Sequence, residues 1–194
     1  MIFLDSDNMN DKKPIIFLIC GKARQGKTTF SNFMEFFYKE NGYKVVNTSF
    51  AKYLKYYAKE INNYDIDETD KKRSYLQELG NFIRSNLHKE YFLINRLIED
   101  IEIYSYYVDV IIINDVRFQK EIETIKENYD NVVTINLVRP DFSTDLSLEE
   151  QNDISEINLD NYNNYDYKII NRNLDELKIL AKRIGLEVID RWKK

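Results

Sequence analysis

Short apolar runs separated by longer amphipathic stretches make up most of the chain. Residues 14–20 (PIIFLIC), 108–115 (VDVIIIND) and 131–138 (NVVTINLV) are apolar at successive positions, as parallel strands buried on both faces should be. Residues 44–50 (KVVNTSF) and 165–170 (YDYKII) are less apolar strand candidates. The pattern therefore predicts five strands.

Apolar residues recur at helical spacing in the stretches between these strands. Four such stripes are Phe30, Phe33, Met34 and Phe37; Leu54, Tyr57, Ala58 and Ile61; Leu76, Leu79, Ile83 and Leu87; and Leu93, Leu97, Ile98 and Ile101. Further helices are expected near residues 120–129 and after Asn173, which forms a capping pattern with Glu176. This alternation predicts an α/β fold of three layers, a five-stranded parallel sheet flanked by helices.

Two polar segments fall outside this alternation. Residues 1–13 are acidic and aperiodic, so we expect a flexible lead-in before a single domain over residues 14–194. Residues 139–164 are also acidic and contain one capping signal, Ser147 with Glu150. A polar stretch of this length is too long for a passive connection, and we expect a mobile lid.

The composition describes a globular protein without a polyanionic partner. The chain of 194 residues is 43% hydrophobic and 31% charged with a net charge of −5, whereas proteins that bind nucleic acid are usually basic. Its single cysteine, Cys20, ends an apolar run, which indicates a small buried side chain and a reducing cytoplasm. The chain begins without a signal-peptide pattern, and no run approaches the about 18 apolar residues of a membrane span. We expect neither nucleic acid nor membrane as a partner.

The segment GKARQGKTT, directly after the first strand, matches the phosphate-binding loop Gly-x4-Gly-Lys-Thr. Its glycines let successive N–H groups point into one concavity, and the following helix directs its positive end there. Lys27 is expected to reach the β- and γ-phosphates of ATP, and the Thr28 hydroxyl to coordinate Mg²⁺. The expected nucleotide-binding residues are Gly21, Lys22, Ala23, Arg24, Gln25, Gly26, Lys27, Thr28 and Thr29.

Asp115 and Arg117 follow the most apolar strand, at the sheet edge where α/β proteins bind ligands. Asp115 is a candidate for holding Mg²⁺ beside the acceptor, directly or through water. The planar fork of Arg117 suits a second phosphate. The alternatives are an aspartate that caps the next turn and an arginine that faces solvent.

A second group of candidates lies between the second and third strands. Arg73, Gln77 and Arg84 are spaced by four and seven residues, so they share one face of a helix. A cationic, amide-bearing face suits a phosphorylated acceptor that carries a base, although a solvated helix face has the same pattern. Arg139 opens the expected lid and is placed to meet the γ-phosphate on closure. With Lys27 and Arg117, it completes the expected catalytic set.

Other classes of site find little support. His88 is the only histidine and has no nucleophile signature around it, and no Cys/His group has the spacing of a zinc site. The segment NLVRP stands where a guanine-nucleotide switch would carry its base-reading element.

The segments SFAKYLK, LQELGNFIR, INRLIEDI, VIIINDVRFQKEIE and LVRPDF, together with the phosphate loop, closely resemble the phage and bacterial deoxynucleoside monophosphate kinases over residues 14–180. The resemblance implies a P-loop NTPase fold related to adenylate kinase, with a segment that binds the nucleoside monophosphate at 51–107 and a lid at 139–164. It implies Mg²⁺-dependent transfer of the γ-phosphoryl group of ATP to a (deoxy)nucleoside 5′-monophosphate. Family members often carry an acidic residue where this chain has Thr28, which favours a direct hydroxyl ligand here.

Two other functions stay open on the sequence. One is a small-metabolite kinase of the same fold, such as one acting on dephospho-coenzyme A, and the other is a non-catalytic module that binds ATP. The arginines beyond the loop argue against the module, and LQELG with NDVRF argues against the metabolite kinase. A homodimer also stays open.

Overall fold

The computed structural model describes residues 13–62, 70–140 and 146–192, without the side chains of residues 62 and 70–73. The predicted lead-in, apart from residue 13, therefore lies outside the described residues. In the part of the chain that the structure describes, no helix has the length and apolar character to cross a membrane.

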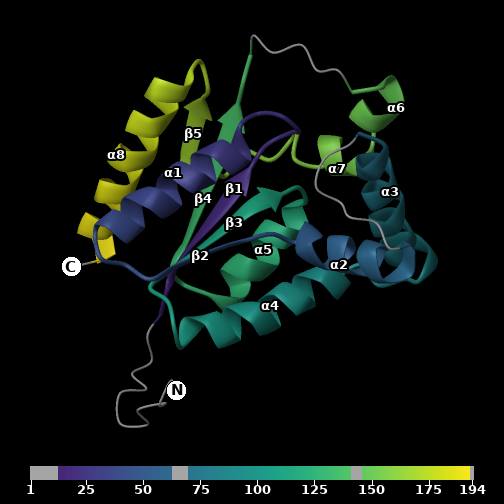
Figure 1. Cartoon of the computed structure of the whole chain (residues 1–194), viewed down its shortest axis with the longest axis horizontal. Coiled ribbons are helices and arrows are strands. Elements are labelled where there is room, and N and C mark those ends of the chain that lie inside the picture. Colours follow the sequence, from purple (N-terminus) through teal and green to yellow (C-terminus); the bar gives the residue numbers. More distant parts are fainter. Residues whose placement is uncertain (1–12, 63–69, 141–145, 193–194) are drawn as a thin grey trace.

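Five parallel strands form one sheet in the order β2-β3-β1-β4-β5 (Figure 1). The strands are β1 (Ile15–Cys20), β2 (Val45–Thr48), β3 (Val110–Val116), β4 (Val132–Val138) and β5 (Tyr167–Ile170). β1 is the central strand and β3 lies beside it; both are almost fully buried, which explains their unbroken apolar sequences. Cys20, the last residue of β1, is 0% exposed. The predicted five-stranded sheet is confirmed.

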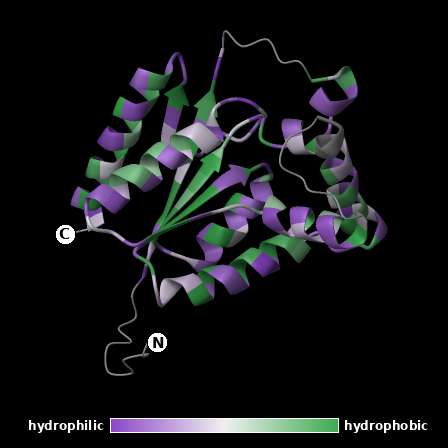
Figure 2. Ribbon diagram, in the orientation of Figure 1, coloured by the Kyte–Doolittle hydropathy of each residue, from purple (hydrophilic) through white to green (hydrophobic). Residues whose placement is uncertain are grey.

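Helices cover both faces of the sheet. α1 (Lys27–Glu40) and α8 (Leu174–Trp192) pack with one face into one apolar core. α2 (Ala51–Asn62), α4 (Phe92–Ser105) and α5 (Gln119–Asn128) pack against the other face into a second core. Figure 2 shows the resulting pattern, with hydrophobic strands between helices that are hydrophobic on one side only. The predicted three-layer α/β architecture is confirmed.

The remaining elements lie toward the edge at which the strands end, where Figure 1 shows them grouped together. They are α3 (Asp70–Asn81), the π-helical turn η2 (Phe82–Asn86), α6 (Leu148–Gln151) and α7 (Ile154–Ile157). The predicted cap of α6 is present, since Ser147 Oγ accepts the N–H of Glu150 at 3.2 Å and the Glu150 carboxylate accepts the N–H of Ser147 at 2.9 Å. Asn173 Oδ1 likewise accepts the N–H of Glu176 at the start of α8.

Two residues of the predicted apolar stripes are exposed, so their assignment to the buried face is wrong. Ile61 is 64% exposed in the last turn of α2, and Leu87 is 48% exposed. η2 precedes Leu87, and its wider turns shift the phase of the helix, so the regular spacing that predicted burial no longer holds.

Candidate active site

The phosphate loop joins β1 to α1, and its two glycines meet a steric requirement. Gly21 has φ +137°, and a Cβ there would lie 2.6 Å from the backbone oxygen of Leu137 on β4. Gly26 has φ +95°, and a Cβ there would clash with the Asn171 side chain, which is held in place by donating to the carbonyl oxygen of Gln25 at 3.0 Å. The loop can therefore follow this path only with glycine at both positions.

α1 begins directly at the end of this loop. Gly26 stands at the N-cap, and no described side chain caps the helix. The first intrahelical bond runs from the N–H of Phe30 to the Gly26 oxygen. A glycine loop that leads into the positive end of a helix is an arrangement that typically binds anions.

Lys27 is held directly over the loop. Its side chain is buried, at 7% exposure for the residue, and Nζ donates to the backbone oxygens of Gly21 and Lys22 at 2.7 Å each. The ammonium group thus lies at the mouth of the concavity, where a phosphate would compete with two neutral carbonyl groups for it.

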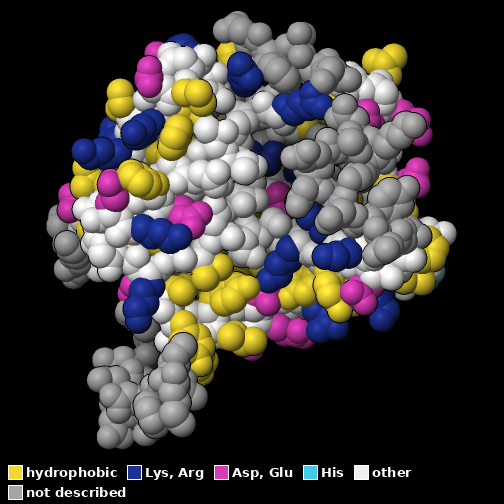
Figure 3. All heavy atoms as spheres, in the orientation of Figure 1, with side chains coloured by type: hydrophobic (Ala, Val, Ile, Leu, Met, Phe, Trp, Pro, Cys, Tyr) yellow, Lys and Arg dark blue, Asp and Glu magenta, His cyan; other side chains and the backbone are white. Residues whose placement is uncertain are grey.

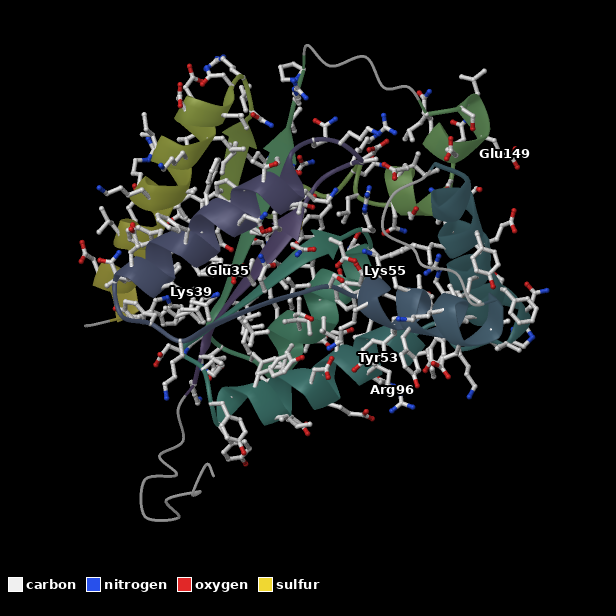
Figure 4. The ribbon with its side chains drawn as sticks, in the orientation of Figure 1. Glu35, Lys39, Tyr53, Lys55, Arg96 and Glu149 are labelled. Carbon is white, nitrogen blue, oxygen red and sulfur yellow. The ribbon has the colours of Figure 1, made fainter. Side chains whose placement is uncertain are left out.

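A cavity of about 560 Å³ opens in front of the loop. Nine of the predicted site residues line it: Ala23, Arg24, Gly26, Lys27, Thr28, Thr29, Asp115, Arg117 and Arg139. We call it the donor cavity. In Figure 3, Lys and Arg side chains stand around the hollowed part of this face. Lys55, which the sequence did not single out, also lines the donor cavity, and Figure 4 shows it on α2.

The other three predicted loop residues face a different cavity. Gly21, Lys22 and Gln25 line a cavity of about 280 Å³ on the side of β4 and α7. The Lys22 ammonium pairs with Asp160 at 2.7 Å, and Gln25 accepts the backbone N–H of Arg139. These side chains connect the loop to the two ends of the predicted lid segment.

Asp115 stands at the end of β3 and organises the start of α2. Its two carboxylate oxygens accept the N–H groups of Phe50 at 2.8 Å and Ala51 at 2.9 Å. Burial raises the pKa of Asp115, while these N–H donors and the charges of Arg117 and Lys27 act in the opposite direction. A capping role and a place in the donor cavity therefore coexist in one residue.

The site suits a magnesium ion that is shared with phosphate. Within residues 13–62, 70–140 and 146–192 no group of three His, Cys, Asp or Glu side chains could enclose a metal by itself. Thr28 and Asp115 line the same cavity, one with a hydroxyl and the other with a carboxylate. One or two such oxygen ligands, completed by phosphate oxygens and water, are what Mg²⁺ usually takes from kinases.

A second cavity, of about 220 Å³, adjoins the donor cavity, and we call it the acceptor cavity. Four of the predicted acceptor residues line it: Gln77, Arg84, Asp115 and Arg117. Ala51, Asp115 and Arg117 line both cavities and so form a shared wall. The side chain of Arg73 lies outside the described residues.

Arg84 reaches the acceptor cavity from η2. Its guanidinium lies 4.4 Å from the centre of the Phe118 ring, and Nη2 donates to Asn81 Oδ1 at 2.8 Å. Burial lowers the pKa of Arg84, although a guanidinium keeps its charge at neutral pH. Stacking on an aromatic face fixes the cation and leaves donors for a ligand.

The acceptor cavity continues into a larger one of about 730 Å³. The two share Arg84, Leu93, Phe118 and Glu121, and the larger one extends to His88, a turn residue with φ +52°. A cavity of about 220 Å³ is smaller than the about 300 Å³ at which ligand pockets usually begin. Together the two offer room for a phosphate with a larger group attached.

Two buried carboxylates in these cavities were missed from the sequence. Glu121, the third residue of α5, and Glu156, in α7, are each 5% exposed. Glu156 pairs with Arg117 Nη1 at 2.9 Å. Glu121 accepts the N–H groups of Arg117 and Phe118, a local helix-cap pattern that the sequence analysis did not use. Glu156 has no such local signal, because its partners come from distant segments of the chain.

Solved structures share this fold with the chain. A mutant APS kinase from Mycobacterium tuberculosis aligns with a TM-score of 0.51 at 10% identity, over 92% of this chain and 98% of that one. A shikimate kinase from Acinetobacter baumannii, in complex with shikimate, aligns with a TM-score of 0.49 at 13% identity, over 95% and 97% of the chains. No protein-family model and no curated protein matches the sequence. The chain has the same α/β fold as this APS kinase.

Proposed function

We propose that this protein transfers the γ-phosphoryl group of ATP to a nucleoside 5′-monophosphate, with deoxynucleotides as the preferred class. The observation that carries the proposal is the shared wall of Asp115 and Arg117 between the two cavities. The phosphate loop lies on one side of this wall, and a second cationic site lies on the other. ATP binding alone would require only the first.

The residues of the two cavities have different roles in this proposal. Lys27 and the N–H groups of α1 hold the transferred phosphoryl group, and Arg139 adds charge from the opening of the lid segment. Arg117 grips the acceptor phosphate at the shared wall, with Arg84 and Gln77 beyond it. Transfer then depends on positioning and charge stabilisation, and the ionised acceptor phosphate attacks without a side-chain base.

Magnesium, when bound, supplies further neutralisation of the phosphate charge. Thr28 and Asp115 are the residues that would hold it, for the reasons of chemistry given above. The preference for a nucleoside monophosphate rests on the resemblance of NDVRF and LQELG to the deoxynucleoside monophosphate kinases and on the space beyond Arg84.

The test is ADP formation from ATP with a panel of acceptors. The panel contains the common deoxynucleoside and nucleoside monophosphates together with dephospho-coenzyme A, and the control is Lys27→Ala. We expect ADP only when a monophosphate is present, with a deoxynucleotide as the best acceptor. ADP formed only with dephospho-coenzyme A would replace the proposal by a metabolite kinase, and binding of ATP without any acceptor-dependent ADP would replace it by a binding module.

A further inference from the structure

Glu156, on α7, lies between the phosphate loop and the acceptor arginine. Its Oε2 accepts the backbone N–H of Ala23 at 2.8 Å, and its Oε1 accepts Nη1 of Arg117 at 2.9 Å. The side chain is 3% exposed and that of Arg117 is 20% exposed, so both charges are largely removed from water. One carboxylate therefore engages donors from both halves of the proposed site.

Contacts with three other elements hold α7 in this position. Asp153, its N-cap, accepts Nδ2 of Asn81 on α3 at 2.8 Å. Asn158, which follows α7, accepts the N–H of Gln119 on α5 at 2.8 Å. Together with the Lys22–Asp160 pair, these bonds fix the turn that carries Glu156.

The groups that Glu156 engages are those that bind phosphate. A loop N–H beside a helix N-terminus and an arginine fork both prefer an oxyanion, and a carboxylate satisfies them in the same way as a phosphate edge. Two anions in contact would repel each other strongly in a buried site. Glu156 occupies Nη1 of Arg117, so a phosphate that approached the same edge of the guanidinium would have to displace this carboxylate.

We propose that Glu156 is an internal competitor for the phosphate site, which substrate phosphate must displace together with α7. This inference rests on the proposed function only in taking the phosphate to be that of a nucleotide. The competition itself does not depend on the proposed function. We call the contacts of Glu156 with Ala23 and Arg117 the latch. In the latched form Glu156 neutralises Arg117 and closes the wall between the phosphate loop and the acceptor cavity. Phosphate releases the carboxylate to solvent and takes over its donors, so α7 opens only when an anion arrives.

The latch lowers apparent affinity by the fraction of molecules that are open. If about one molecule in ten is open without ligand, removal of the latch strengthens binding about tenfold. We expect Glu156→Gln to bind inorganic pyrophosphate and ADP about five- to tenfold more tightly than the wild type. Glutamine keeps the shape of the side chain but places an amide N–H against one of the two donors.

The experiment is isothermal titration of pyrophosphate and of ADP into three variants and the wild-type protein. Glu149→Gln is the matched control, because it makes the same charge change on α6, where Figure 4 shows Glu149 at the outer edge of the molecule. Asp153→Ala is the second variant. It removes the cap of α7 and its bond to Asn81 without touching the phosphate donors, so it should also strengthen binding, by about two- to fivefold. Circular dichroism establishes that each variant is folded.

Unchanged affinity in both α7 variants would overturn the competition. Weaker binding in Glu156→Gln would overturn it in the other direction, since Glu156 would then be a support that positions Arg117 for phosphate. Binding of pyrophosphate is measured without an acceptor and without turnover. The test therefore gives an answer even if the protein does not phosphorylate monophosphates. Conversely, if the protein phosphorylates monophosphates but the affinities of the variants are unchanged, the latch is refuted and the proposed function stands.

Discussion

Glu121 gives the clearest prediction of how the site affects stability. Its Oε2 accepts the N–H groups of Arg117 at 2.8 Å and Phe118 at 3.0 Å, which fixes the turn between β3 and α5. Burial raises the pKa of Glu121 to about 8, and the negative charge of Asp115 adds to this rise, while the two N–H donors and Arg84 oppose it. The carboxyl group thus stays largely protonated at neutral pH.

The magnitude follows from linkage between protonation and folding. The ordinary pKa of the group is 4.5, so between pH 4.5 and about 8 the folded protein keeps a proton that the unfolded chain has lost. The stability that Glu121 contributes is complete below pH 4.5 and is lost as the pH rises through about 8. At about 1.36 kcal/mol for each pKa unit, the difference between the two values corresponds to at most about 5 kcal/mol.

The perturbation is Glu121→Gln, which keeps an oxygen for the two N–H donors and removes the titration. Urea unfolding between pH 5 and pH 8.5 measures the free energy of unfolding of both proteins. We expect the stability of the wild type to fall relative to the variant by about 2–4 kcal/mol across this range. Glu127→Gln, an exposed glutamate of the same helix, should track the wild type. Parallel curves for the wild type and Glu121→Gln would refute the reasoning.

Three further predictions concern the phosphate groups. Lys27→Ala should lower kcat by about 10²–10³, the cost of one electrostatic stabiliser, and near-normal ADP formation would remove Lys27 from the mechanism. Arg117→Lys keeps the charge but loses the fork, so the KM for the monophosphate should rise more than about tenfold while that for ATP barely changes; equal rises in paired saturation curves would contradict this assignment. Gly26→Ala forces a side chain into φ +95° against Asn171, so it should lower the free energy of unfolding by about 1–3 kcal/mol and weaken pyrophosphate binding; an unchanged urea midpoint would contradict it.

The parts of the fold that sequence could predict are those set by local patterns. β1 and β3 are buried on both faces and therefore read as unbroken apolar runs. The phosphate loop needs glycine and lysine at fixed positions, and so its sequence alone locates the anion site. Asp115 and Arg117 could be placed because parallel strands end at one edge of a sheet.

The rest depends on contacts between distant segments. The N–H of Ala23 and the carboxylate of Glu156 are 133 positions apart, and nothing near Glu156 distinguishes it from the exposed acidic residues of the same segment. Lys55 lies on the polar side of α2, where lysine is ordinary, and only the folded chain turns it toward the donor cavity. A site built from side chains on several elements is visible only after those elements are packed.

The fate of the γ-phosphate of ATP decides whether this protein phosphorylates nucleoside monophosphates. The protein is incubated with ATP labelled at the γ-position, Mg²⁺ and each deoxynucleoside monophosphate, and the nucleotides are separated. We expect the label to appear in the deoxynucleoside diphosphate, with one ADP formed for each labelled product. Label found only in inorganic phosphate, or retained in ATP with every monophosphate, would contradict it.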